Sequence, residues 1–196
     1  MIEELNAGTF IPEDALRDMN IGEIVQRCKN GDYEAWNMIV DRYAKTVYNL
    51  ALNFFNNRED AEDITQDIFL KVYNNIEKFR EDKSFNSWLV KISTNYCIDH
   101  WRKSKRSARR VELSDDLIKT DHTPEDRAVK DHDVMNLRNK MSHLDPDLRL
   151  LLIMRDIQDH SYKEIATTLN LPLGTIKSRI NRARIKLAKT FMDEEH

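Results

Sequence analysis

Residues 161–187, SYKEIATTLNLPLGTIKSRINRARIKL, decide the fold of the C-terminal part of this chain. Ser161 and Glu164 have the spacing of a capping box, which predicts the start of a short helix. Asn170 can adopt the left-handed conformation that ends such a helix, and Pro172 marks the start of the next one. The stretch therefore predicts two helices joined by a tight turn, a helix-turn-helix.

The second of these helices has an apolar face and a basic face. Its inner stripe consists of Ile176, Ile180, Ala183 and Leu187. At 3.6 residues per turn, the side chains that project away from this stripe are Thr175, Ser178, Asn181 and Arg182, flanked by Lys177, Arg179 and Arg184. Arginine can read guanine in a major groove, and flanking bases can neutralise phosphates. The pattern favours DNA binding over a helix hairpin with a merely solvated basic face.

Residues 20–110 carry four further apolar patterns of helical period. The first ends near Gly31, and Asp32 is placed to cap the second. The third begins after Asn57, and the fourth starts near Ser84. These four helices are expected to form one domain that ends in a basic tail.

Composition supports an all-α fold. The chain of 196 residues is 40% hydrophobic and 33% charged, and it contains only 4 Gly and 4 Pro, so helices joined by short connections are favoured. We predict two small helical domains joined by a flexible acidic linker, and Asp145 before Pro146 as a helix start in the second domain. The expected segments are an N-terminal extension (1–19), a first domain (20–110), the linker (111–131) and a second domain (132–196).

Two helices of the first domain carry candidate functional faces. The helix from Glu59 to Tyr73 has an acidic and amide-bearing row made of Asp60, Asp63, Gln66 and Asp67. Acids near a helix N-terminus also suit the helix dipole, and an Asp67–Lys71 pair is an ordinary surface feature, so the row alone decides nothing.

The helix from Ser84 to Arg102 is more informative, because basic, polar and aromatic groups share its outer face. Lys91, Asn95 and Arg102 lie opposite the stripe of Trp88, and a basic run follows. Such a mixture suits a strand with unpaired bases, since stacking and phosphate neutralisation both matter there. Whether Trp101 packs or stacks remains open at this point.

Three stretches resemble the extracytoplasmic-function (ECF) sigma factors of bacterial RNA polymerase. Residues 60–79, DAEDITQDIFLKVYNNIEKF, resemble their polymerase-binding helix, and residues 84–103, SFNSWLVKISTNYCIDHWRK, resemble their promoter-melting helix. The helix-turn-helix of residues 161–187 resembles their C-terminal motif. All three occur in the family's order, which implies a factor that binds the polymerase core and directs it to promoter DNA, commonly under the control of an anti-sigma factor.

The resemblance also implies roles for individual residues. Contacts to the polymerase core are expected from Asp60, Asp63, Gln66 and Asp67. Contacts to the −10 element, including a base flipped into the loop 79–86, are expected from Phe79, Asn86, Lys91, Asn95, Asp99, Arg102 and Lys103. Readers of the −35 element are expected to be Thr175, Lys177, Ser178, Arg179, Arg182 and Arg184. Residues 148–153 are expected to offer a further surface to the polymerase.

Other functions fit the sequence less well. An operator-binding regulator would use the helix-turn-helix but would leave the two stretches of the first domain unexplained. No phosphate-binding glycine loop or nucleophile motif occurs, so we expect no enzyme, no cofactor and no metal, with Cys97 and His100 making only half a ligand set. Without a signal peptide or an apolar run of about 20 residues, a cytoplasmic location is expected.

Overall fold

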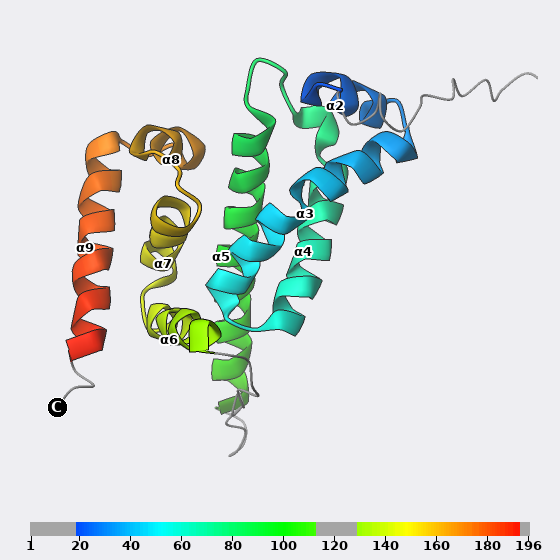
Figure 1. Cartoon of the computed structure of the whole chain (residues 1–196). Helices are drawn as coiled ribbons and strands as arrows, with labels where there is room; N and C mark the ends of the chain where they lie inside the picture. Colours follow the sequence, from blue (N-terminus) through cyan, green and yellow to red (C-terminus); the bar gives the residue numbers. More distant parts are fainter. Residues whose placement is uncertain (1–18, 113–128, 193–196) are drawn as a thin grey trace, which may run out of the picture.

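The computed structural model describes residues 19–112 and 129–192, which are helical with short connections. The helices are α2 (Ile21–Lys29), α3 (Tyr33–Phe55), α4 (Arg58–Tyr73), α5 (Phe85–Glu112), α6 (Val129–Ser142), α7 (Pro146–Leu152), α8 (Tyr162–Leu169) and α9 (Leu173–Met192) (Figure 1). A 3-10 turn, η1 (Ile76–Lys78), follows α4, and a π-helical turn, η2 (Ile153–Ile157), continues α7. The prediction of an all-α fold with two small helical domains is confirmed.

Polar caps fix where the helices of the first domain begin and end. Asn20 and Glu23 form a capping box at α2. Asp32 accepts hydrogen bonds from two backbone amides in the first turn of α3, at 2.9 and 3.2 Å, as predicted. Asn56 ends α3 in the left-handed conformation, and Asn57 then caps α4. Each cap supplies partners for backbone groups that a helix end leaves unpaired.

The apolar stripes of α2 to α5 meet in one core. Its buried side chains include Ile24, Val25, Ile39, Val47, Leu50, Phe54, Ile64, Ile68, Val72 and Leu89. Burying one such side chain contributes about 1.5–3 kcal/mol, so these contacts hold the four helices as one unit. The opposite faces of α4 and α5 are thereby directed outward.

The second domain consists of α6 to α9. Ser161 and Glu164 form the predicted capping box at α8, and Asn170 ends this helix with φ at 54°. Ile176 and Ile180 of α9 are buried, so the predicted helix-turn-helix is present. Residues 148–152 of α7 are buried, because α9 packs on this helix and α3 and α5 also contact it. The expectation that residues 148–153 offer an outward surface is wrong, since the leucines of this stretch and Ile153 are buried.

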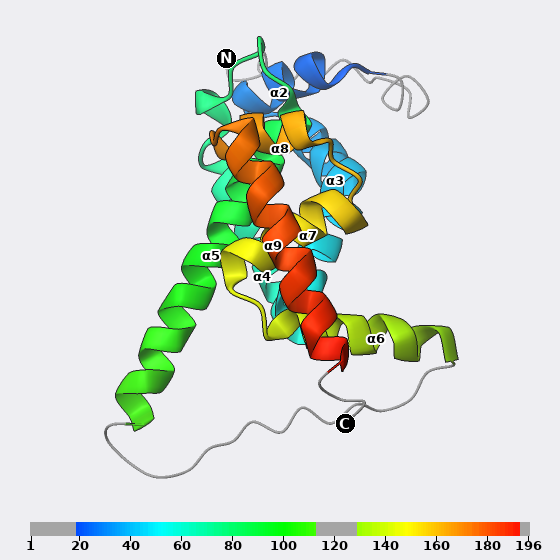
Figure 2. The ribbon, with the colours of Figure 1, turned by 90° about the vertical axis from the view of Figure 1, so that its left-hand side faces the viewer.

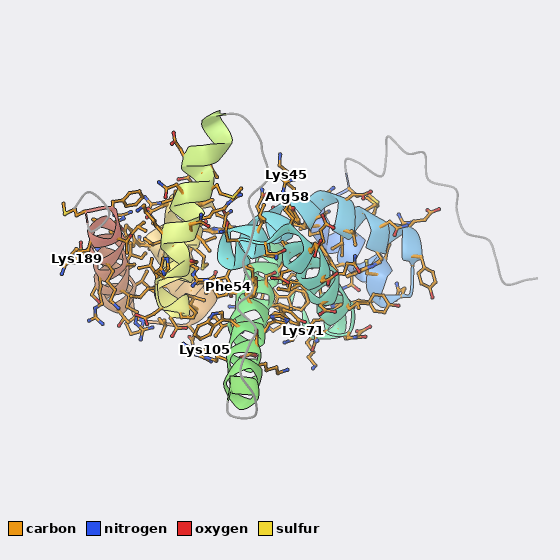
Figure 3. All side chains as sticks on the ribbon, turned by 90° about the horizontal axis from the view of Figure 1, so that it is seen from below. Lys45, Phe54, Arg58, Lys71, Lys105 and Lys189 are labelled. Carbon is orange, nitrogen blue, oxygen red and sulfur yellow. The ribbon has the colours of Figure 1, made fainter. Side chains whose placement is uncertain are left out.

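The two domains pack directly against each other, and α5 lies between them. α3 and α4 contact α5 from the first domain, while α7 and α8 contact it from the second (Figure 1). In Figure 3, Phe54 lies between the two sets of helices. Hydrogen bonds across the interface include those from Arg138 Nε to Asn53 Oδ1 (2.9 Å), Asn56 Nδ2 to Asn139 Oδ1 (2.5 Å) and Gln158 Nε2 to the Thr46 carbonyl (3.4 Å).

Two details differ from the sequence-based expectations. Asp145 precedes α7 but makes no side-chain cap bond; its carboxylate instead accepts from Lys186 Nζ at 2.6 Å. α5 continues to residue 112 and α6 starts at residue 129, so both helices extend into the stretch 111–131 that was expected to be linker.

Candidate nucleic-acid and partner interfaces

The acidic row of α4 lies on an exposed face of the first domain. Asp60, Asp63, Gln66 and Asp67 are all exposed, while Ile64 and Ile68 on the other side are buried. Beside Gln66, an open hollow of about 460 Å³ lies between α3 and α4. Its lining residues are Ala44, Lys45, Tyr48, Glu62, Thr65 and Gln66. The face therefore combines fixed carboxylates with a recess that can receive a partner's side chain.

Sequence reasoning missed one apolar residue on this face. Leu70 is 61% exposed although it follows Gln66 by one helical turn and Asp63 by two. Tyr73, also exposed, packs edge-to-face on Trp36 with ring centroids 5.1 Å apart. Leu70 and Tyr73 thus add exposed apolar surface beside the acidic row, and apolar groups rimmed by polar ones are a feature of binding surfaces. The same three- and four-residue spacing that identified the acids could have identified Leu70.

Between α4 and α5, Asp67 and Lys71 both contact Tyr96, instead of forming the simple ion pair that the sequence suggested. Tyr96 Oη of α5 donates to Asp67 Oδ2 at 2.5 Å, and Lys71 Nζ lies 5.4 Å from the centroid of the Tyr96 ring. Asp67 is thus hydrogen-bonded to the neighbouring helix α5, and Lys71 lies over the ring of Tyr96. His100, one turn further along α5, stacks on Tyr96 at 6.1 Å.

The outer face of α5 carries most of the expected −10 contacts. Lys91, Asn95, Asp99, Arg102 and Lys103 are exposed, and Asn86 is partly exposed at the start of the helix. Arg102 Nη2 lies 3.8 Å from Asp147 Oδ1 of α7, so the second domain approaches this face. The lower end of α5, with its basic residues, extends away from the other helices (Figure 2). Trp101 is partly buried, and Lys105 Nζ lies 5.0 Å from the centroid of its ring, so packing and cation contact coexist there.

Phe79 does not lie on the surface with these residues. Its side chain is 4% exposed and contacts Phe85 and Trp88, with ring centroids 5.3 Å away in both cases. Tyr43 of α3 adds a fourth ring, 5.2 Å from Phe85. The expected contact between Phe79 and DNA is therefore replaced by a structural one, since the cluster anchors both ends of the loop 80–84. Arg80 and Asp82, paired at 3.1 Å, remain exposed on that loop.

On α9 the expected −35 residues face outward to different degrees. Lys177, Ser178, Arg182 and Arg184 are exposed, whereas Thr175 and Arg179 are partly buried. Arg184 differs from the rest, because its guanidinium binds both carboxylate oxygens of Asp156, at 2.5 and 3.2 Å. The hydrogen bond to Asp156 also raises the pKa of Arg184. Arg184 is thus already engaged, while Arg182 presents its charge on the open side of the helix.

The two cysteines are buried, so their thiols are not expected to be reactive. Cys28 and Cys97 are free thiols inside the core. Burial raises the pKa of Cys28 to about 11 and that of Cys97 to about 12, so both thiols stay protonated at neutral pH.

Among residues 19–112 and 129–192, no cluster of three or more His, Cys, Asp or Glu could hold a metal ion. Within the same residues, no helix is long and apolar enough to span a bilayer.

Comparison with known proteins places these features in a family. The family model for Sigma-70 region 2 matches residues 39–107, and the model for Sigma-70, region 4 matches residues 135–187. The ECF RNA polymerase sigma factor SigW of Bacillus subtilis is 31% identical over 185 residues, which cover 90% of this chain and 99% of SigW. The ECF RNA polymerase sigma-E factor of Escherichia coli K12 is 31% identical over 171 residues, covering 82% and 88% of the two chains.

A region 2 helical bundle followed by a region 4 helix-turn-helix defines the class of sigma subunits, which initiate transcription. The chain belongs to the ECF sigma factors of RNA polymerase. The resemblance drawn from the three sequence stretches is thereby confirmed, and the operator-binding alternative is not favoured.

Two solved structures share the fold. CnrH in complex with the cytosolic domain of CnrY superimposes with a TM-score of 0.65 at 22% identity, over 89% of this chain and 97% of the other. The sigma factor RpoE in complex with the anti-sigma factor NepR from Bartonella quintana gives a TM-score of 0.63 at 22% identity, over 80% and 96%. At this level of identity the likeness concerns the fold.

Proposed function

We propose that this sigma factor divides its work among three helices. The exposed face of α4 binds the polymerase core, the outer face of α5 holds the unpaired −10 strand, and α9 reads the −35 duplex. The first two belong to a domain of residues 20–110 and the third to a domain of residues 132–196. The extension 1–19 and the linker 111–131 fall almost entirely outside the described residues. The observation that carries the proposal is the exposed acidic row of α4 beside the basic outer face of α5.

The α4 surface suits a basic protein partner. Its carboxylates are held on a helix whose other side is buried, so they lose little conformational freedom on binding. Leu70 supplies an apolar centre, and the hollow beside Gln66 offers a place for a partner's side chain. Interfaces gain most of their affinity from such central anchors surrounded by polar groups. Asp63 and Gln66 flank this centre and are our leading candidates for core contacts.

The α5 surface suits single-stranded DNA. Lys91, Arg102 and Lys103 can neutralise phosphates, while Asn95 can bond to exposed base edges. The adjacent loop 80–84 is anchored by buried aromatic rings but is itself exposed, so it can receive an unpaired base without rearranging the core. Trapping extruded bases offsets an unpairing cost of a few kcal/mol, by analogy with base-flipping enzymes.

The α9 surface suits duplex DNA. The N-terminal half of a recognition helix contacts base edges in a major groove, and Thr175, Ser178 and Arg182 lie on that side of α9. Arg182 is the residue best placed to bond guanine, and Lys177 can bind a flanking phosphate. Sequence recognition of the −35 element is thus assigned to this helix, with polymerase contacts left to the first domain.

The docked arrangement of the two domains is a closed state that must open at a promoter. Elements centred about 25 base pairs apart are separated by about 85 Å of duplex at about 3.4 Å per base pair. A compact chain of 196 residues has a radius of gyration of about 16 Å. The domains as packed here cannot reach both elements, so we infer that α7 and α8 leave α5 when the chain is bound to polymerase and DNA.

Polymerase performs the chemistry, and this chain supplies recognition without catalytic activity of its own. Its place of action is then the cytoplasm, where polymerase and promoter are found. Because CnrH and RpoE of B. quintana were solved with the cytosolic domain of CnrY and the anti-sigma factor NepR, respectively, we infer an anti-sigma partner for this chain as well. The interface between its two domains would be a place where such a partner could act.

The proposal is tested by size-exclusion chromatography with purified bacterial core polymerase. The wild-type chain is expected to co-elute with core, and the double variant Asp63→Ala, Gln66→Ala is expected to elute separately. A matched variant with Glu34→Ala and Asn37→Ala, two exposed residues of α3, should co-elute like wild type. Co-elution of the Asp63/Gln66 variant would refute the α4 assignment, and failure of the wild-type chain to bind would refute the proposed mode of action.

A further inference from the structure

Tyr96 joins the two functional helices of the first domain. Its hydroxyl donates to Asp67 on the exposed row of α4, and its ring lies beneath the ammonium group of Lys71, one turn further along α4. Asp67 and Lys71 therefore hold one aromatic side chain of α5 from two consecutive turns. The neighbour of Tyr96 in sequence is Asn95, which belongs to the outer, strand-binding face of α5.

A contact of this kind fixes the rotation of α5 about its own axis. Apolar packing between α4 and α5 resists separation but is less specific about small rotations, since apolar contacts are not directional. A side-chain tip at a radius of about 6 Å moves by about 1 Å when the helix rotates by about 10°. Binding groups need to be held within about 0.5 Å and 10–20° of their productive geometry. A directional bond from Tyr96 to Asp67 therefore matters for where Asn95 points.

The bond is suited to persist throughout the working range of pH. Burial, followed by the hydrogen bond to Asp67, raises the pKa of Tyr96 to about 12, so the phenol keeps its proton and remains a donor. The carboxylate of Asp67 has two oxygens and about four acceptor sites. Its Oδ2 atom receives Tyr96 while Oδ1 remains able to receive a cation from a partner. Polymerase binding at Asp67 and the bond to Tyr96 are thus compatible.

We propose that Tyr96 is a positioning residue, whose bond to Asp67 holds the strand-binding face of α5 in a fixed orientation relative to the polymerase-binding face of α4. The inference rests on the proposed function of these two faces. It assigns Tyr96 a role in promoter opening rather than in core affinity, since its side chain bridges the helices at their flank instead of forming part of the exposed α4 face.

The test is the variant Tyr96→Phe, which keeps the ring and removes only the donor. The affinity for core polymerase is measured by fluorescence anisotropy, and promoter opening is measured at saturating core with a fluorescent base analogue in the −10 element. The dissociation constant should change by less than about twofold, while the opening rate should fall about fivefold, equivalent to about 1 kcal/mol. Tyr33→Phe, which removes the hydroxyl of an exposed tyrosine on α3, should change neither quantity.

A double-variant experiment separates a direct bond from a general effect. In an Asp67→Ala background, assayed at saturating core, adding Tyr96→Phe should not slow opening further, because the acceptor is already gone. Additive losses, an unchanged opening rate in Tyr96→Phe, or equal losses of affinity and opening would each overturn the inference. If the wild-type chain itself fails to bind core or to open the promoter, the proposed function fails instead, so the two failures are distinguishable.

Discussion

The Nη1 atom of Arg149 in α7 lies 2.6 Å from the carbonyl oxygen of Phe54 in the last turn of α3. Arg149 is 5% exposed, and its guanidinium stacks over the Phe54 ring at 5.1 Å. Its other donors reach the carbonyls of Met141 (2.9 Å), Ser142 and Leu144 (3.2 Å) at the end of α6. One cation thus binds carbonyls near two helix ends, one in each domain, where the helix dipoles also favour a positive charge.

Arg149→Met should destabilise the chain by about 3 kcal/mol. Methionine fills similar space but takes the arginine donor away from the carbonyl oxygens of Phe54, Ser142 and Leu144, and each unsatisfied group costs about 1–3 kcal/mol. Burial lowers the pKa of Arg149, so part of the stabilisation offsets the cost of desolvating the charge. The free energy of unfolding, obtained from urea titration followed by circular dichroism, checks the prediction.

Arg155→Met is the matched control for this experiment. Arg155 lies in the same domain, stacks on Tyr162 at 5.1 Å and donates to the His160 carbonyl at 3.1 Å. Only this bond and the stacking are lost, so we expect about 1 kcal/mol. Equal destabilisation by the two variants would contradict the assigned role of Arg149.

Opening of the closed state should be visible by energy transfer. With Cys28→Ser and Cys97→Ser as background, dyes attached at Asn37→Cys on α3 and Lys163→Cys on α8 report on the distance between the domains. Transfer should be efficient in the free chain and low in the promoter complex, as the elements are about 85 Å apart. A control pair at Lys163→Cys and Lys189→Cys, within one domain, should not change. High transfer in the promoter complex would rule out the inferred opening.

Arg182 and Arg184 should differ in their contribution to −35 recognition. Arg182→Ala should weaken holoenzyme binding to a consensus promoter by about 5-fold to 160-fold, since a bidentate base contact contributes about 1–3 kcal/mol. Arg184→Ala should weaken promoter binding less than Arg182→Ala, because Asp156 already binds the Arg184 guanidinium. Binding of both variants to promoters with intact and scrambled −35 elements gives the comparison. If the two substitutions are equivalent, the pairing with Asp156 has no bearing on DNA recognition.

The cysteines should behave as buried thiols. Ellman's reagent at pH 8 should label Cys28 and Cys97 slowly in the native chain and rapidly in denaturant. Because folding raises both thiol pKa values above the ordinary 9.0, the unfolded chain ionises first as pH rises. The free energy of unfolding should therefore be insensitive to these groups below pH 9 and fall above it. Rapid labelling of either thiol in the native chain would contradict this prediction.

Much of the fold could be predicted because local signals agreed with each other. Asp32 caps α3, Ser161 and Glu164 form a capping box, and Asn170 ends α8 as the sequence indicated. These capping interactions involve residues only three or four positions apart, so they can be predicted without knowing how the helices pack. The docking of the domains was not predictable in this way. Arg149 and Phe54 are 95 residues apart in sequence. A single arginine in a leucine-rich helix does not indicate which carbonyl groups will accept its hydrogen bonds.

The candidate sites were predictable as helix faces but not as individual environments. Helical periodicity placed Asp63, Gln66 and Lys91 on outer faces, where the structure also has them. It could not show that Phe79 is buried among aromatic rings from α3 and α5, because that contact depends on how the helices pack. For the same reason it did not anticipate that the carboxylate of Asp67 binds a tyrosine on another helix.

The most direct test of the division of labour between α5 and α9 compares two holoenzymes on one promoter. DNase protection reports −35 binding, and permanganate reactivity reports unpaired thymines near −10. With Lys91→Ala and Asn95→Ala on α5, we predict an intact −35 footprint without permanganate reactivity. With Arg182→Ala on α9, the −35 footprint should weaken more than the permanganate reactivity. Loss of both signals to the same extent in both holoenzymes would contradict the assignment of melting to α5 and duplex reading to α9.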